Sequence, residues 1–121
     1  MSIEYSTKNK DKYFLVNCSG ESSELEVVSN YAREVSELCK KQGYKRMLVD
    51  ERKREYRLSE VLDLYKLANF FVTLDISSIR IAIVCQPRYI DHVRFFETTV
   101  NNRGMQIKYF VDPDGAKRWL L

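Results

Sequence analysis

The segment Ile79–Cys85 is apolar at every position except Arg80, and it constrains the fold more than any other stretch. A strand with one wet face alternates apolar and polar residues, whereas a continuous apolar run is typical of a strand covered on both faces of a mostly parallel sheet. A helical pattern precedes this segment, and Pro87 begins another after it. The alternation predicts an α/β domain with this segment as a central strand, parallel to residues 48–49.

Length and charge limit the possibilities. The chain has 121 residues, which is typical of a single domain spanning 1–121. Its 20 Lys and Arg residues stand against 17 Asp and Glu residues, so the formal net charge is +3. This excess is too slight to indicate a nucleic-acid-binding protein.

The cysteines and the hydropathy pattern bear on location. Cys18, Cys39 and Cys85 are odd in number and far apart, which is typical of reduced, buried thiols in a cytosolic protein. No apolar run approaches the roughly 18 residues that a membrane span needs, and the N-terminus lacks the apolar core of a signal peptide. We therefore expect a cytoplasmic protein without a transmembrane segment.

The N-terminal third predicts a hairpin, a helix and a strand. Residues 3–7 and 13–18 have strand patterns, and a polar link joins them. A capping box begins at Ser23, and the helical pattern after it ends at Gly43. Residues 44–50 then predict a strand with an apolar centre.

The segment 51–57 carries four basic and two acidic residues and has no apolar periodicity, so it predicts a loop. A mobile charged loop is a natural contact surface. The candidate interaction residues are Asp50, Glu51, Arg52, Lys53, Arg54, Tyr56 and Arg57.

Two longer helices and a short one complete the pattern. Ser59 is the expected N-cap of a helix that ends near Asp75, and Pro87 opens a helix that stops at Gly104. Residues 105–111 predict an edge strand, and Asp112 caps a final short helix. The predicted buried stripes are Val61, Leu64 or Tyr65, Ala68 and Phe71 in the first helix, Ile90, Val93, Phe96 and Val100 in the second, and Ala116, Trp119 and Leu120 in the last.

This order of elements, with the helix around Phe95-Phe96-Glu97, Gly104 and the closing segment 111–120, resembles the SpoIIAA-like, STAS-type family. The pattern is similar to that of uncharacterised bacterial members. The resemblance implies a mostly parallel sheet of about five strands with an N-terminal β-hairpin, and four helices in a right-handed βα superhelix. Its motifs are core and capping residues, so they bear on the fold rather than on chemistry.

The resemblance also implies a candidate phosphoswitch. Anti-sigma-factor antagonists of this family are phosphorylated on a serine where the middle strand passes into the next helix, within Asp-Ser-Ser-Gly. Ser59 occupies roughly that place, but Leu58-Ser59-Glu60 lacks the adjacent serine and glycine. A serine at this position also caps free backbone amides, which is the plainer interpretation.

Catalysis is the least supported function. The carboxyl ends of the predicted strands gather a candidate ligand crevice of Ser19, Gln86 and Arg88. However, His92 is the single histidine, and nothing supplies it with a nucleophile at a recognisable spacing. We expect no enzyme, no cofactor and no metal site.

Two binding functions remain. The first is a regulatory or protein-interaction domain, and the alternative is a carrier or sensor of a small apolar or anionic ligand, lipid-like in kind. We also expect a homodimer through an uncovered sheet face or the N-terminal edge, with segment 51–57 outside the interface.

Overall fold

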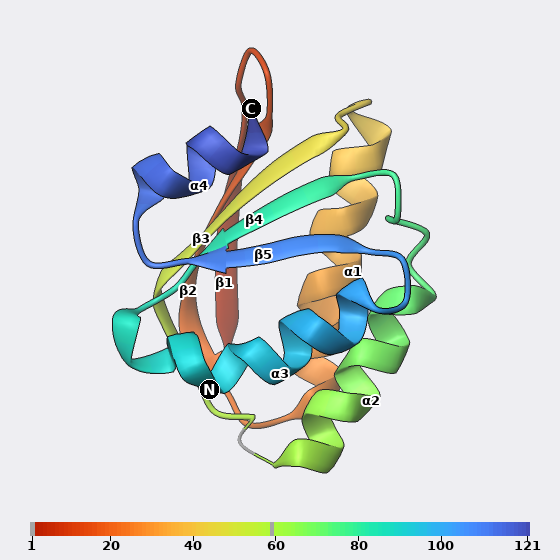
Figure 1. The fold of residues 1–121 in the computed structure, drawn as a ribbon, viewed down its shortest axis with the longest axis vertical. Helices are drawn as coiled ribbons and strands as arrows, with labels where there is room; N and C mark the ends of the chain where they lie inside the picture. The colour runs from red at the N-terminus through yellow and green to blue at the C-terminus, as the bar shows by residue number, and fades with distance from the viewer. Residues whose placement is uncertain (1, 59) are drawn as a thin grey trace.

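The structure is a computed structural model that describes residues 2–58 and 60–121. Its five strands form one sheet in the order β1-β2-β3-β4-β5 (Figure 1). β1 and β2 are antiparallel, and all the other neighbours are parallel. The predicted α/β class and N-terminal hairpin are therefore confirmed. The strands are β1 (Ile3–Asn9), β2 (Phe14–Ser22), β3 (Arg46–Tyr56), β4 (Arg80–Val84) and β5 (Gln106–Phe110).

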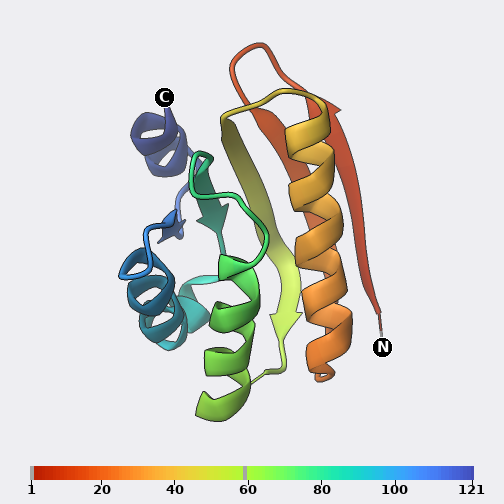
Figure 2. The same ribbon diagram turned by 90° about the vertical axis from the view of Figure 1, so that its right-hand side faces the viewer.

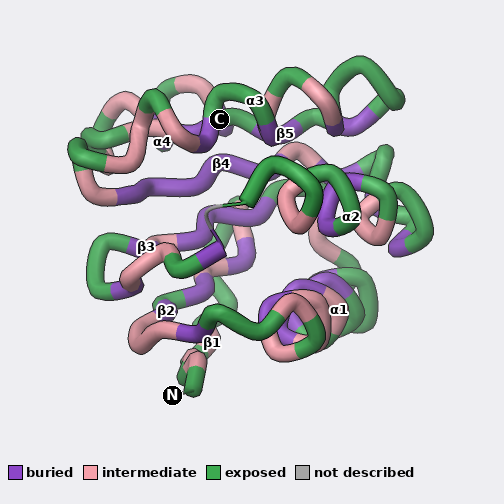
Figure 3. The backbone as a smooth tube through the Cα atoms, turned by 90° about the horizontal axis from the view of Figure 1, so that it is seen from below, coloured by how far each residue is buried: buried purple, intermediate pink, exposed green. Residues whose placement is uncertain are grey.

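Four α-helices cover the sheet on two sides. The larger core lies between the sheet and the first three helices, and a smaller core lies under α4 on the opposite face. Figure 2 shows α1 lying along the hairpin, and Figure 3 shows α4 on the other side of the sheet from α1 and α2. The helices are α1 (Leu25–Lys41), α2 (Val61–Val72), α3 (Ile90–Asn101) and α4 (Pro113–Leu120), and a short 3-10 turn, Pro87–Tyr89, precedes α3.

The apolar segment around β4 is an interior strand, as predicted. Leu48 pairs with Ala82 and Val49 with Ile83 in a parallel ladder, and β5 covers the other edge of β4. Figure 3 shows β4 buried along nearly its whole length. The middle strand of the five is β3, however, so β4 is interior without being central.

The C-terminal elements also follow the predictions. β5 is an edge strand, and α3 buries Val93, Phe96 and Val100. Asp112 caps α4 by accepting hydrogen bonds from the backbone N–H groups of Asp114 and Gly115. α4 packs on β3, β4 and β5. The apolar part of the sheet face that we expected to be uncovered is therefore covered by α4.

The two other helix starts differ from the prediction. α1 begins at Leu25, its N-cap residue is Glu24, and Glu24 makes no side-chain cap. β2 continues to Ser22, whose hydroxyl accepts from the Glu24 N–H at 3.0 Å, so the strand displaces the predicted capping box at Ser23. α2 begins at Val61 with Glu60 as its N-cap residue. Ser59, the predicted cap and candidate phosphoswitch, lies outside the described residues.

The buried face of α2 is also shifted from the predicted one. Leu67 and Ala68 are buried, with Leu64 and Phe71 partly buried against the larger core. The predicted stripe included Val61, which faces solvent, and it left Leu64 and Tyr65 as alternatives, of which Leu64 packs against the core and Tyr65 is exposed. Val61 and Tyr65 each have an apolar neighbour in the sequence, so periodicity alone did not determine which face of this helix is buried.

The largest correction concerns the predicted interaction loop, Asp50, Glu51, Arg52, Lys53, Arg54, Tyr56 and Arg57. All of these residues except Arg57 belong to β3. β2 continues to Ser22 and pairs with β3 as far as Tyr56, so the backbone of this segment is held in the parallel ladder. Glu51 and Arg54 are buried. They are therefore part of the interior and not of a mobile surface.

Candidate functional site

A bulge in β3 gathers charged and aromatic side chains inside the molecule. Asn17 pairs with Asp50 and Ser19 with Lys53, so two β3 residues lie opposite Cys18 where a regular ladder has one. In a regular strand, residues 51 and 54 would face opposite sides of the sheet. The extra residue brings both side chains to the side covered by α1, α2 and α3.

Glu51 is the acceptor at the centre of this site. Its carboxylate accepts from the Tyr31 hydroxyl at 2.9 Å, from Arg54 Nη1 at 3.0 Å and from the Tyr56 hydroxyl at 2.5 Å. Tyr31 comes from α1, whereas the other two donors come from β3 itself. The carboxylate is thereby hydrogen-bonded and paired with a cation, which is the condition for burying it.

Arg54 is held by this pair and by two aromatic rings. Its guanidinium carbon lies 4.9 Å from the centre of the Tyr56 ring and 5.4 Å from that of Tyr31. Only 8% of Arg54 is exposed, and its Nε–H is buried without a hydrogen-bond acceptor among the described residues. One donor of the buried pair is therefore unsatisfied, which is unusual in a protein interior.

The electrostatics of the site keep its tyrosines protonated. Burial and the Glu51 carboxylate raise the pKa of Tyr31, Tyr56 and Tyr109 well above the ordinary value. Burial alone would lower the pKa of Arg54, but Glu51 raises it above its usual range. The phenols of the site are therefore neutral at neutral pH, and Arg54 keeps its charge.

A cavity of about 70 Å³ lies against this group. Its walls come from all three helices of the larger core, with Ala32 from α1, Leu67 from α2 and Phe96 from α3. Arg54 lines it, and exposed Arg57 lies at its rim. The lining is therefore mainly apolar and aromatic, with Glu51, Arg54, Arg57 and His92 as its charged or polar members. A mostly apolar lining with a few polar groups is the usual composition of a small-molecule site.

The predicted ligand crevice is only partly assembled. Gln86 and Arg88 meet at the Glu55 carboxylate, which also accepts from the Tyr89 hydroxyl at 2.5 Å. These hydrogen bonds lower the pKa of Glu55. Ser19 instead lines a separate surface depression with Asn17 and Lys53, residues of β2 and β3.

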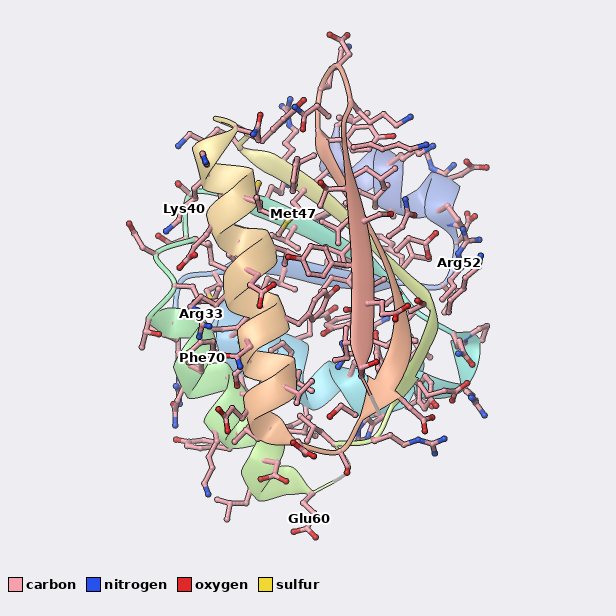
Figure 4. The ribbon with its side chains drawn as sticks, turned by 180° about the vertical axis from the view of Figure 1, so that it is seen from behind. Arg33, Lys40, Met47, Arg52, Glu60 and Phe70 are labelled. Carbon is pink, nitrogen blue, oxygen red and sulfur yellow. The ribbon has the colours of Figure 1, made fainter. Side chains whose placement is uncertain are left out.

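The remaining residues of the predicted interaction segment lie at the surface. Arg52 donates to Asp50 through Nη2 at 2.7 Å and holds the pKa of that carboxyl below its usual range. Figure 4 shows the Arg52 side chain directed away from the sheet. Lys53 is exposed, and Arg57 pairs with Glu21 at 2.9 Å.

The thiols and the histidine show no activated nucleophile. Burial raises the pKa of Cys18 to about 12 and that of Cys85 to about 11, so both thiols are protonated at neutral pH. His92 donates from Nε2 to the Leu58 carbonyl oxygen at 3.1 Å at the cavity wall. Within residues 2–58 and 60–121, no group of three or more His, Cys, Asp or Glu side chains is arranged to hold a metal ion.

A second feature is the outer face of α2, where four apolar side chains are exposed to solvent. Val61 is 65% exposed and Leu62 is 61% exposed. Tyr65 and Val72 continue this row along the helix, and Phe95 is a further exposed aromatic residue on α3. We call Val61, Leu62, Tyr65 and Val72 the α2 apolar row. Apolar residues clustered on one surface mark contact sites more often than isolated ones do.

The sequence interpretation did not single out Tyr31, Tyr109 or the pairing of Glu51 with Arg54. A buried ion pair and a surface ion pair have the same residue types, so no local pattern distinguishes them. The nearest signal was the concentration of aromatic residues, which most often indicates core packing.

Comparison with known proteins gives the fold. No protein-family model matches the chain, and no curated protein matches it. An anti-sigma factor antagonist from Mycobacterium paratuberculosis aligns with a TM-score of 0.64 at 16% identity, over 98% of this chain and 94% of that one. An uncharacterised protein with a SpoIIAA-like fold from Shewanella loihica aligns with a TM-score of 0.54 at 18% identity, over 99% and 94%.

Both alignments extend over nearly the whole of each chain and include the hairpin, the parallel strands and the four helices. No helix in the part of the chain that the structure describes has the length and apolar character needed to cross a membrane. The chain is an α/β domain of the SpoIIAA-like, STAS-type fold.

Proposed function

We propose that this chain is a non-catalytic regulatory domain that acts by binding another protein. The observation that carries the proposal is the α2 apolar row, because two of its residues leave more than half of their surface in water. Exposing large aliphatic side chains has no benefit for the isolated domain, since their burial would stabilise it by about 25 cal/mol for each Å² removed from water. A protein partner would bury them.

The structural neighbour from Mycobacterium paratuberculosis supports this kind of function. That protein is an anti-sigma factor antagonist, so its action is directed at an anti-sigma factor. In this chain the α2 apolar row begins two residues after Ser59, the candidate phosphoswitch position. We propose that phosphorylation of Ser59 adds negative charge next to this contact surface in the sequence and so changes the binding of the partner.

The test uses a photoreactive phenylalanine at position 62, with a matched control at Glu37, which is exposed on α1. We expect the probe at position 62 to cross-link one protein that the probe at position 37 does not reach. The partner is then purified, and its complex with this chain is measured by calorimetry. Leu62→Glu should weaken the complex at least tenfold, and Glu37→Gln should leave it unchanged.

Equal affinity of wild-type protein and Leu62→Glu for every reconstituted partner would overturn the proposal. Light scattering of the same samples at micromolar concentration tests the expected homodimer. If the partner at position 62 is a second copy of this chain, wild-type protein will have the dimeric mass and Leu62→Glu the monomeric mass.

A further inference from the structure

The unsatisfied donor of Arg54 and the cavity beside it are separate from the α2 apolar row, because Arg54 belongs to β3 and the row lies on the outer face of α2. Arg54 is more than nine-tenths buried, and its Nε–H has no acceptor among the described residues. Buried N–H groups nearly always have a partner, which is either protein, ordered water or a ligand. Arg54 lines the cavity beside it, so an acceptor for this donor can approach from there.

We propose that this cavity is a binding site for a small uncharged molecule that presents one hydrogen-bond acceptor to Arg54 Nε. The other lining residues are mainly apolar and aromatic side chains from the three helices and from β3, β4 and β5, and Glu51, Arg57 and His92 are the polar ones among them. The apolar side chains fit the hydrocarbon part of such a molecule. An alcohol, a ketone or an amide has this combination of groups.

The charges at the site favour an uncharged ligand over an anion. Arg54 is already paired with Glu51, whose carboxylate lies 3.0 Å from Nη1. A second carboxylate at Nε would gain attraction from Arg54, but it would be repelled by Glu51 at a similar distance. Its own desolvation would then be uncompensated. A neutral oxygen makes the hydrogen bond without this cost.

The volume limits the size of the ligand. At about 70 Å³, the cavity has roughly half the volume of an engineered cavity that admits benzene, which is on the order of 150 Å³. A molecule of a few non-hydrogen atoms fits inside. A longer one would extend past Arg57 at the rim.

The experiment is an NMR titration that follows the Arg54 Nε–H signal, with acetamide and acetate as probes. These two molecules have nearly the same shape, and only acetate is charged. We expect acetamide to shift the Arg54 Nε–H signal saturably, and acetate to bind at least tenfold more weakly. Because the signal belongs to the Nε–H group itself, it reports on the environment of that hydrogen, and a variant of the cavity wall separates binding in the cavity from an indirect shift.

The matched variant is Ala32→Val, which adds two methyl groups to the cavity wall and leaves Arg54 and Glu51 unchanged. It should weaken acetamide binding at least tenfold while the other signals of the spectrum show a folded protein. Ala68→Gly is the control, because Ala68 is a buried residue of the same core outside the cavity lining.

Three results would overturn the inference. Acetate binding as tightly as acetamide would contradict the uncharged class of ligand. An Arg54 signal that neither probe shifts would show that the cavity does not bind this class of molecule. An equal shift by acetamide in Ala32→Val would show that acetamide acts from outside the cavity.

Discussion

The two halves of β3 have the same backbone conformation and opposite compositions. Residues 47–50 pair with β2 on one edge and with β4 on the other. Residues 53–56 pair with β2 alone, because β4 ends at Val84. On the free edge, Gln86 Nε2 donates to the Arg54 carbonyl oxygen at 3.1 Å, so a side chain replaces one ladder hydrogen bond of the absent strand.

The two parts of β3 bury different kinds of side chain. Met47 and Leu48 are buried on opposite faces of the sheet, one against each core. Glu51 and Arg54 are buried on one face, where they pair with each other. Burial in residues 46–50 therefore depends on hydrophobic side chains, whereas in residues 51–56 it depends on the pairing of two opposite charges.

The largest expected effect comes from breaking the buried pair with a change of equal size. Glu51→Gln leaves the Arg54 charge without a counterion, so the free energy of unfolding should fall by about 3–5 kcal/mol. Urea unfolding followed by circular dichroism measures it. Glu37→Gln, the same change at an exposed position of α1, is the control.

A second variant distinguishes loss of the pair from loss of a single group. Replacing both residues, as Glu51→Leu with Arg54→Met, removes both charges and should restore most of the lost stability. If the double variant is as unstable as Glu51→Gln, the hydrogen bonds of the tyrosines matter more than the ion pair. A loss below about 1 kcal/mol in Glu51→Gln would contradict the burial of an ionised pair.

The apolar half of β3 should tolerate the matched change. Met47→Leu conserves the volume of a buried side chain, so we expect a loss of less than about 1.5 kcal/mol in the same urea measurement. A larger loss than that of Glu51→Gln would reverse the comparison.

The smallest effect is expected from the exposed arginine of the same strand. Half of the Arg52 side chain is in water, and its pair with Asp50 is a surface ion pair. Arg52→Ala should therefore lower the free energy of unfolding by only about 0.2–1 kcal/mol. The loss should shrink further in high salt, because exposed pairs are screened. An effect of Arg52→Ala that is larger than that of Glu51→Gln and insensitive to salt would contradict the placement of Glu51 in the interior and of Arg52 at the surface.

Much of the fold was predictable because its signals are local. The apolar run of β4, the stripe of α3 and the cap at Asp112 each arise from residues close together in the chain. Parallel order then follows from the helices between the strands. The candidate site was predicted poorly for the opposite reason, since Tyr31, Glu51 and Arg54 meet across two elements.

By itself, the sequence determined the class of the fold, the hairpin, the order of helices and strands, and the strand that both cores cover. Only the tertiary structure decided that residues 51–56 are a strand, because that depends on a neighbouring β2 long enough to supply the hydrogen bonds. It also decided which charges are buried. A one-residue bulge opposite Cys18 turns Arg54 toward Glu51, and such a bulge exists only in the pairing of two strands.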